Sequence, residues 1–209
     1  MKKLKLTVDI SMTFLLLLSM CYETVGSVFE KFFGLDAYEY GAVIHEYIGT
    51  AFILLVIFHL WLNRRWLMNI FKGKYNPARF VLISADIILI IDIAFILISG
   101  VMMSRVLGFD AEEMSFARTS HMLASYWGYV IMSFHVGLHI KKFPIILVAP
   151  ALYGCYAFVK RQIHEYMFLI TEFVFFDFEE PLTFFIMDYI AVMILFAGLG
   201  YLVMKVCRR

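Results

Sequence analysis

Four histidines form two matched pairs in this chain, which contains 6 histidines among 209 residues. His45 and His59 are 14 positions apart, and His121 and His135 have the same separation. In an α-helix this separation makes nearly four turns and about 21 Å of rise, so both members of a pair lie on about the same face. Neutral imidazole is a common metal ligand. The spacing therefore predicts two ligand positions on each of two helices.

The two pairs belong to an internal repeat. The segment GLDAYEYGAVIHEYIGTAFILLVIFHLWLN at 34–63 resembles GFDAEEMSFARTSHMLASYWGYVIMSFHVGLH at 108–139. Upstream of them, Asp9-Ile10 matches Asp86-Ile87 more loosely. A single intramembrane histidine is more often structural than a ligand, although ionisable residues in a span are functional candidates. Repetition of a whole pair favours ligation, and a fixed period points to one duplicated unit.

Composition indicates a membrane protein. The chain is 63% hydrophobic and 17% charged, whereas soluble domains are roughly half apolar and about a quarter charged. The net charge of +1 gives no indication of nucleic-acid binding. A transmembrane helix needs roughly 20 apolar residues, and the sequence predicts six spans, the fifth of them short and interrupted by Pro150 and Gly154. These spans are 8–26, 43–62, 80–103, 119–140, 144–159 and 182–204.

The spans and the repeat predict an all-α integral membrane bundle in two parts. Residues 1–142 would form a four-helix core from the repeats 1–76 and 77–142. Residues 143–209 would form a C-terminal transmembrane hairpin with an interfacial segment on the outer face.

Charged loops predict the orientation. Lys and Arg collect on the cytoplasmic side, and they gather at the N-terminus, at 64–79, at 141–142 and at the C-terminus. Loops at 30–39, 110–113 and 177–180 are acidic and alternate with them. Both termini are therefore expected in the cytoplasm. Lys160 and Arg161 fall on the outer side and do not fit this pattern.

The pairing predicts two haem sites. One helix separates the two histidine helices, so they run in the same direction. His45 would then lie level with His121 on the outer side, and His59 with His135 on the inner side. Two imidazoles facing across a bundle suit the axial positions of a haem iron, and Gly49 leaves room beside the outer pair. Zinc wants close tetrahedral donors, and 14 residues separate the histidines of one helix.

Three further residues are candidates for cofactor contacts. Arg64 and Arg118 lie at ends of the histidine helices and could pair with haem propionates, since Arg binds carboxylates in bidentate fashion. The positive-inside pattern alone explains Arg64 equally well. His139 follows His135 by one turn and could bind a propionate, replace His135 or line a quinone site. His139 could equally be an interfacial histidine with no functional role.

Three carboxylates lie in or near the spans. Asp92, near the middle of the third span, could orient a histidine, relay a proton or bond to a neighbouring helix. Asp9 and Asp86 lie at cytoplasmic ends, where a charged residue needs no special role. His164 is expected at the surface of an outer loop.

The chain resembles the flavinylation-associated cytochrome family, with a di-haem core of the cytochrome b type. The resemblance rests on the histidine spacing and on HEYIGTAFILLVIFHLWLN, FHVGLH and YGCYAFVKRQIHEYMFLITEFVFFDFEEP, and it covers most of the chain. It implies two haem b groups, a place in the bacterial inner (cytoplasmic) membrane and an extracytoplasmic FMN-binding partner. Asn63 stands where that family often has His, so position 63 cannot be a haem ligand.

Electron transfer across the membrane is the function these features predict. The donor would be the quinone pool or a cytoplasmic-side reductase, and the acceptor an extracytoplasmic flavinylated protein. The chain contains no glycine-rich nucleotide fingerprint, so we expect a component of an oxidoreductase system. A quinone- or superoxide-reactive cytochrome, a metal-ion transporter and a cofactor-free scaffold are the alternatives.

Overall fold

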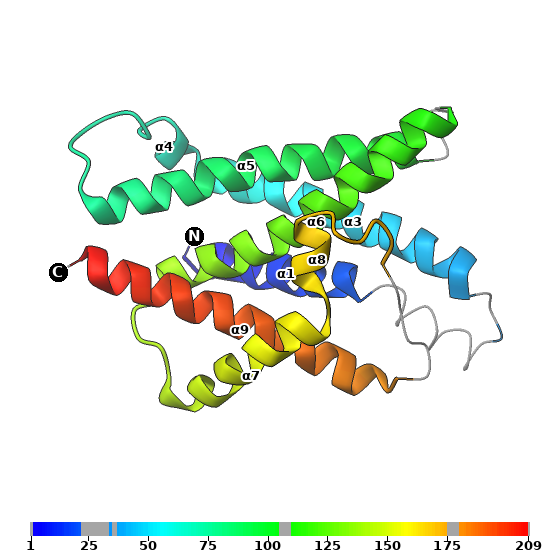
Figure 1. Cartoon of the computed structure of the whole chain (residues 1–209). Coiled ribbons are helices and arrows are strands. Elements are labelled where there is room, and N and C mark those ends of the chain that lie inside the picture. Colours follow the sequence, from blue (N-terminus) through cyan, green and yellow to red (C-terminus); the bar gives the residue numbers. More distant parts are fainter. Residues whose placement is uncertain (1, 22–33, 35–36, 105–109, 175–179, 209) are drawn as a thin grey trace. The chain divides into compact units, whose positions relative to one another are not determined.

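The computed structural model describes residues 2–21, 34, 37–104, 110–174 and 180–208 (Figure 1). Helix accounts for 83% of the structure, and the described residues form no strand, so the all-α prediction is confirmed for them. The elements are α1 (Lys2–Met20), α3 (Ala37–Leu62), α4 (Arg64–Leu67), α5 (Pro77–Met103), α6 (Ala111–His139), the 3-10 turn η1 (Ile145–Leu147), α7 (Val148–Lys160), α8 (Ile163–Met167) and α9 (Leu182–Cys207).

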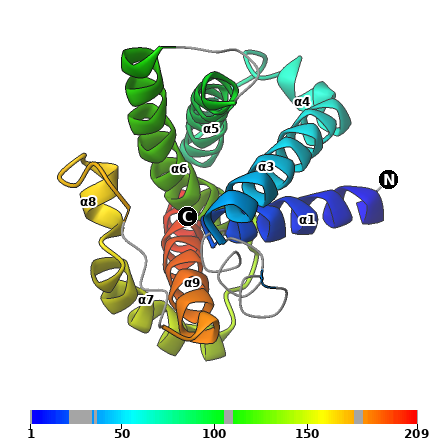
Figure 2. The ribbon, with the colours of Figure 1, turned by 90° about the vertical axis from the view of Figure 1, so that its right-hand side faces the viewer.

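The chain divides into two compact units, each with its own helical hairpin. The first unit comprises Met1–Gly73 and Phe176–Ile186, and the second comprises Lys74–Phe175 and Met187–Arg209. In the first unit α1 packs against α3, and in the second unit α5 packs against α6 (Figure 1, Figure 2). Parts of the predicted acidic loops, with Glu30, Asp36, Asp177 and Glu179, and the end of the first predicted span at 22–26 lie outside the described residues.

The two histidine helices begin at matching positions of the repeat. Asp110 caps α6, because its Oδ1 accepts hydrogen bonds from the backbone N–H groups of Glu112 and Glu113 at 3.0 and 2.9 Å. The Glu113 carboxylate accepts in return from the Asp110 backbone N–H at 3.1 Å, which completes a capping box. The helix therefore starts at Ala111. Its counterpart α3 starts at Ala37, the matching position of the repeat.

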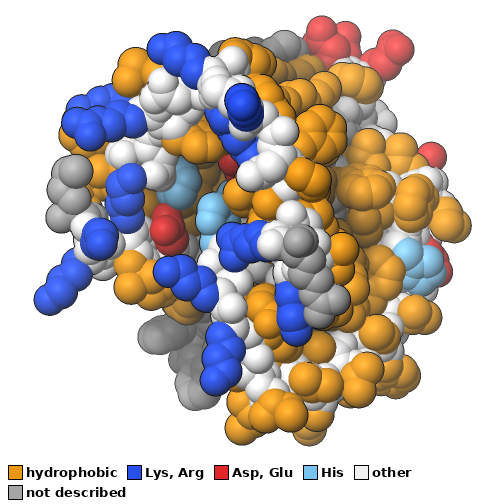
Figure 3. Space-filling model, turned by 90° about the vertical axis from the view of Figure 1, so that its left-hand side faces the viewer, with side chains coloured by type: hydrophobic (Ala, Val, Ile, Leu, Met, Phe, Trp, Pro, Cys, Tyr) orange, Lys and Arg blue, Asp and Glu red, His pale blue; other side chains and the backbone are white. Residues whose placement is uncertain are grey.

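Among the described residues, three helices are long and apolar enough to cross a membrane, namely Gly41–Leu62, Pro77–Met103 and Leu182–Cys207. The apolar helix Ile145–Lys160 is shorter than a span needs. Hydrophobic side chains cover much of the face drawn in Figure 3. Many large apolar side chains are also exposed along the helices, as in proteins whose helices face lipid, whereas soluble monomers rarely expose large contiguous apolar patches. Along α5 the exposed apolar side chains are Ile88, Ile90, Ile91, Phe95, Leu97, Ile98 and Val101.

Glycines bring the backbones of the second unit close together. A Cβ on Gly137 of α6 would clash with the Ala197 carbonyl of α9, and one on Gly200 of α9 would clash with the Phe134 carbonyl of α6. Gly154 does not break α7; a Cβ there would clash with the carbonyl of Ala191 in α9. Small residues allow such close approach between membrane helices. The glycines therefore hold α6 and α7 against α9.

Gly200→Ala should lower the free energy of unfolding by about 1–3 kcal/mol, because backbone atoms cannot move aside for the new methyl group. Gly198→Ala is the matched control two residues away. Its Cβ would lie 3.3 Å from Cζ of Phe143, the far end of a side chain that can shift. Thermal unfolding of the two variants in detergent measures the difference. Equal stability of both variants would contradict close backbone packing between α6 and α9.

Candidate functional site

One stripe of α6 faces polar groups of α5. His121, Gly128 and His135 are separated by seven residues each, which is nearly two helical turns, so they share a face. The three positions contact Ser99 and Ile96, Asp92, and Asp86 of α5 in that order. The residue numbers of the contacts rise along α6 while they fall along α5, because the two helices run in opposite directions. A single register thus determines all of these contacts.

His121 is held by two acceptors. Its Nδ1 lies 3.2 Å from the carbonyl oxygen of Ile96 and 3.1 Å from Oγ of Ser99. The carbonyl oxygen can only accept, so Nδ1 carries the hydrogen and donates it. The Ser99 hydroxyl donates onward to the carbonyl of Phe95 at 2.6 Å. Nε2 of His121 therefore keeps its lone pair and can serve as a ligand atom.

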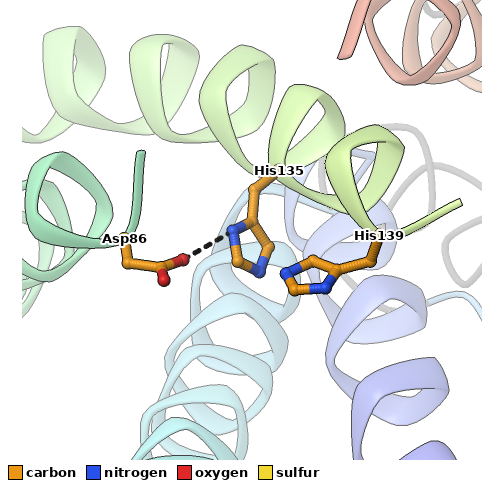
Figure 4. Close-up of side chains that lie close together, drawn as sticks. All are labelled: Asp86, His135 and His139. Atoms are coloured by element: carbon orange, nitrogen blue, oxygen red, sulfur yellow. Dashed lines mark ion pairs between the residues drawn. The ribbon is translucent and has the colours of Figure 1, made fainter. Parts of the chain in front are cut away.

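His135 sits between a carboxylate and a second histidine. Its Nδ1 lies 2.8 Å from Oδ1 of Asp86 (Figure 4). The contact has the length of an ion pair without the alignment of a hydrogen bond. The ring of His139 lies on the other side, with 4.8 Å between ring centroids and 62° between ring planes. The carboxylate of Asp86 therefore contacts Nδ1 of His135, so Nε2 is the ring atom that could bind a metal.

The first unit repeats this arrangement around His59. Nδ1 of His59 donates to Oδ1 of Asp9 at 2.8 Å. Nε2 lies 3.3 Å from Nδ2 of Asn63, the amide nitrogen, which can only donate. Oδ1 of Asn63 accepts from Nζ of Lys5 at 2.6 Å. His59 thus has its hydrogen on Nδ1, as His121 does, and a ligand at Nε2 would replace the long contact with Asn63.

Asp9 and Asp86 hold equivalent positions in the two hairpins. Each lies on the first helix of its hairpin and contacts the second histidine of the pair at the same 2.8 Å. Their boundary positions led us to expect no role for either residue. In the sequence, only the loose match of Asp9-Ile10 with Asp86-Ile87 indicated that the two residues are equivalent. The packing of each hairpin shows why, because it brings each Asp against a histidine.

Asp92 of α5 faces a glycine of α6. Its carboxylate points at Gly128, where a Cβ would overlap Oδ2, so glycine makes room for it. Oδ2 of Asp92 is buried and has no hydrogen-bond partner within the described ranges. The contact with a histidine ring that we considered for Asp92 is instead made by Asp86, at His135.

The remaining candidates lie on or beside the histidine helices. His45 is on α3 with a buried Nδ1, and a Cβ on Gly49 one turn later would meet no atom within 4 Å. Arg118 is exposed on α6. Arg64 is exposed on α4, with its guanidinium 4.9 Å from the Trp61 ring centroid. Lys and Arg side chains are prominent at the surface in Figure 3.

The donor set suits a haem iron. His59, His121 and His135 each have Nδ1 against an acceptor, which is how histidine ligands are commonly oriented toward metals. Each predicted pair, His45 with His121 and His59 with His135, has one member in each unit. The pairing across the units therefore stays a prediction.

A second ligand set lies within one unit. Ligand atoms of Asp86, His135 and His139 all lie within 4.8 Å of one another. Two histidines and one carboxylate are a known set for divalent metals. His135 therefore belongs both to the predicted inner haem pair and to a possible site for a divalent metal ion.

No protein-family model matches the chain, and no curated protein or solved structure is significantly similar to it. The resemblance to the flavinylation-associated cytochromes stays a prediction from the sequence.

Asp188 is a buried carboxylate whose role we did not expect. Its side chain is 1% exposed on α9, yet Nζ of Lys160 lies 2.8 Å and Nη2 of Arg161 lies 2.6 Å from its Oδ2. The hydroxyl of Tyr153 donates to Oδ1 at 2.6 Å. These contacts explain the two basic residues that did not fit the loop pattern. An acid in the apolar segment 182–204 was the signal in the sequence.

Asp188→Asn should lower the free energy of unfolding by roughly 3–5 kcal/mol, because it removes the charge that two cations share at a buried position. Asp92→Asn is the matched control, since Oδ2 of Asp92 has no hydrogen bond in the described structure. Thermal unfolding in detergent compares the two. A larger loss for Asp92→Asn than for Asp188→Asn would contradict this account of the ion pairs.

Proposed function

We propose that this chain is a membrane-embedded di-haem b-type cytochrome that transfers electrons across the cytoplasmic membrane. The observation that carries the proposal is the repeated contact of a histidine Nδ1 with a carboxylate at 2.8 Å in both hairpins. Such contacts fix the tautomer and orient Nε2 toward a metal. Their recurrence at matching positions of the repeat is hard to explain by packing alone.

The chain's own residues would hold the cofactors. His45 and His121 would hold the outer haem, and His59 and His135 the inner haem. When bound, haem iron supplies one-electron redox chemistry. Asp9 and the Ile96 carbonyl accept the hydrogen on Nδ1 of His59 and His121, and Asp86 lies against Nδ1 of His135, so Nε2 of each ring would face the iron. Arg64 and Arg118 are candidates to pair with the propionates, and His139 is a candidate for a quinone site.

The bilayer and two redox partners complete the proposal. We infer six spans with both termini in the cytoplasm, supported by three long apolar helices and by the alternating loop charges. Electrons would come from the quinone pool or a cytoplasmic-side reductase. They would leave to an extracytoplasmic FMN-binding protein, as the family resemblance implies.

One observation favours a different function. The cluster of Asp86, His135 and His139 could hold a divalent metal ion without haem. A metal-ion transporter that uses intramembrane His and Asp is therefore the second candidate. It differs from the first in requiring no haem.

The purified protein should contain two haem b groups per chain. Dithionite-reduced minus oxidised spectra and pyridine-haem quantification measure their type and number. His45→Ala and His135→Ala should each lose about half of the haem, because each variant removes one ligand of one site. His164→Ala is the control, since its Nε2 lies 3.9 Å from Glu165 on α8, outside the histidine helices.

Two results would reject the cytochrome. One is a protein that takes up no haem when haem is supplied. The other is full haem content in both His45→Ala and His135→Ala. Stoichiometric zinc or manganese in a haem-free preparation, lost in His139→Ala, would support the transporter instead.

The proposed orientation predicts which cysteines react from outside the cell. In a background without Cys21 and Cys155, Cys207 should resist a membrane-impermeant maleimide in intact cells and react after lysis. Glu112→Cys should react in intact cells, because the first turn of α6, which contains Glu112, is expected on the outer side. Labelling of Cys207 in intact cells would contradict the cytoplasmic C-terminus.

A further inference from the structure

Basic residues from three helices gather at one end of the second unit. Leu138 of α6, Met204 of α9 and Ala85 of α5 form a buried cluster near that end, and Ala78 packs against it. The end of α6, the end of α9 and the start of α5 therefore lie together (Figure 1). Five exposed basic side chains lie at or beside these helix ends, and we call them the basic end: Lys74, Lys141, Lys142, Lys205 and Arg208.

Within the described ranges, no carboxylate neutralises the basic end. The ion pairs of the second unit include none of its five residues. Nζ of Lys205 lies 5.9 Å from the ring centroid of Tyr201, a contact that leaves the charge in place. Nη1 of Arg79 donates to the backbone carbonyl of Lys74 at 3.1 Å, which holds Lys74 at the start of α5. The basic end therefore presents five positive charges in one region of this unit.

Exposed apolar side chains border the basic end. Val206, directly after Lys205, is 68% exposed. Ile145 and Ile146 follow Lys142 within four residues, and they are 89% and 78% exposed. A phospholipid carries an anionic headgroup and acyl chains in one molecule, so it could occupy both kinds of surface at once. An acidic protein or a nucleic acid would meet only the charges and leave the apolar border uncovered.

We propose that the basic end binds the headgroup of an anionic phospholipid, whose acyl chains lie against the exposed apolar side chains beside it. Anionic lipids of a membrane attract Lys and Arg residues close to its surface, and basic pockets between membrane helices bind their headgroups. The preference of cytoplasmic segments for Lys and Arg explains on which side the basic residues lie. The packing of three helix ends gathers them at one site. The inference involves only the second unit and goes beyond the proposed function.

The experiment compares two lipids that differ in headgroup charge. The full-length protein is reconstituted in phosphatidylcholine vesicles. Electron paramagnetic resonance then measures how strongly spin-labelled phosphatidylglycerol and spin-labelled phosphatidylcholine associate with it. Phosphatidylglycerol should associate more strongly, and added salt should reduce the difference, because salt screens exposed charges. In Lys141→Gln/Lys142→Gln and in Lys205→Gln, each lost charge should lower the association of phosphatidylglycerol about fivefold.

Charge-preserving variants separate headgroup binding from a structural role. Lys141→Arg/Lys142→Arg should keep the wild-type preference, and all variants should keep the same helix content by circular dichroism, since these side chains are exposed. Equal association of the two lipids with the wild-type protein would overturn the inference, as would an unchanged preference in both glutamine variants. Binding of soluble polyglutamate without a lipid preference, lost in the glutamine variants, would assign the surface to an acidic protein instead. A haem-free protein would refute the proposed function alone, because this test does not involve haem.

Discussion

The register between α5 and α6 is the constraint on which the site depends. It sets Asp86 against His135, Asp92 against Gly128, and Ser99 against His121. A slip of one residue would carry each of these partners about 100° around its helix and separate them. Polar groups without partners are costly in a bilayer, where water cannot replace the lost contact. The polar contacts therefore select the register as well as depend on it.

Packing around α9 supports that register. The glycine contacts at Gly137 and Gly200 hold the C-terminal part of α6 against α9. Asp188 fixes the other end, because it joins α9 to the end of α7 through Lys160 and Arg161. The glycine contacts need closely packed backbones and the ion pairs need a partner for a buried charge, so neither allows the helices to shift along one another. Because α9 is held to both α6 and α7, it forms a fixed support for α6, which carries His121 and His135.

The sequence was enough to predict the helices but not their side-chain contacts. Long apolar segments are local signals, so the helices of both hairpins could be predicted from them. The contact of Asp86 with His135 joins residues 49 positions apart, and only the hairpin register brings them together. The role of Asp188 needed the fold for the same reason. The depth of Asp92 in the span likewise gave no sign that it faces Gly128.

The two hairpins differ at one position, and the difference bears on the choice between haem and metal. Asn63 donates to Nε2 of His59 and is itself held by Lys5, so the first hairpin offers no second imidazole there. His139 takes that place in the second hairpin and completes a cluster with Asp86 and His135. Metal chelation by this cluster uses the same histidine that the inner haem needs. The two ligands should therefore exclude each other at His135.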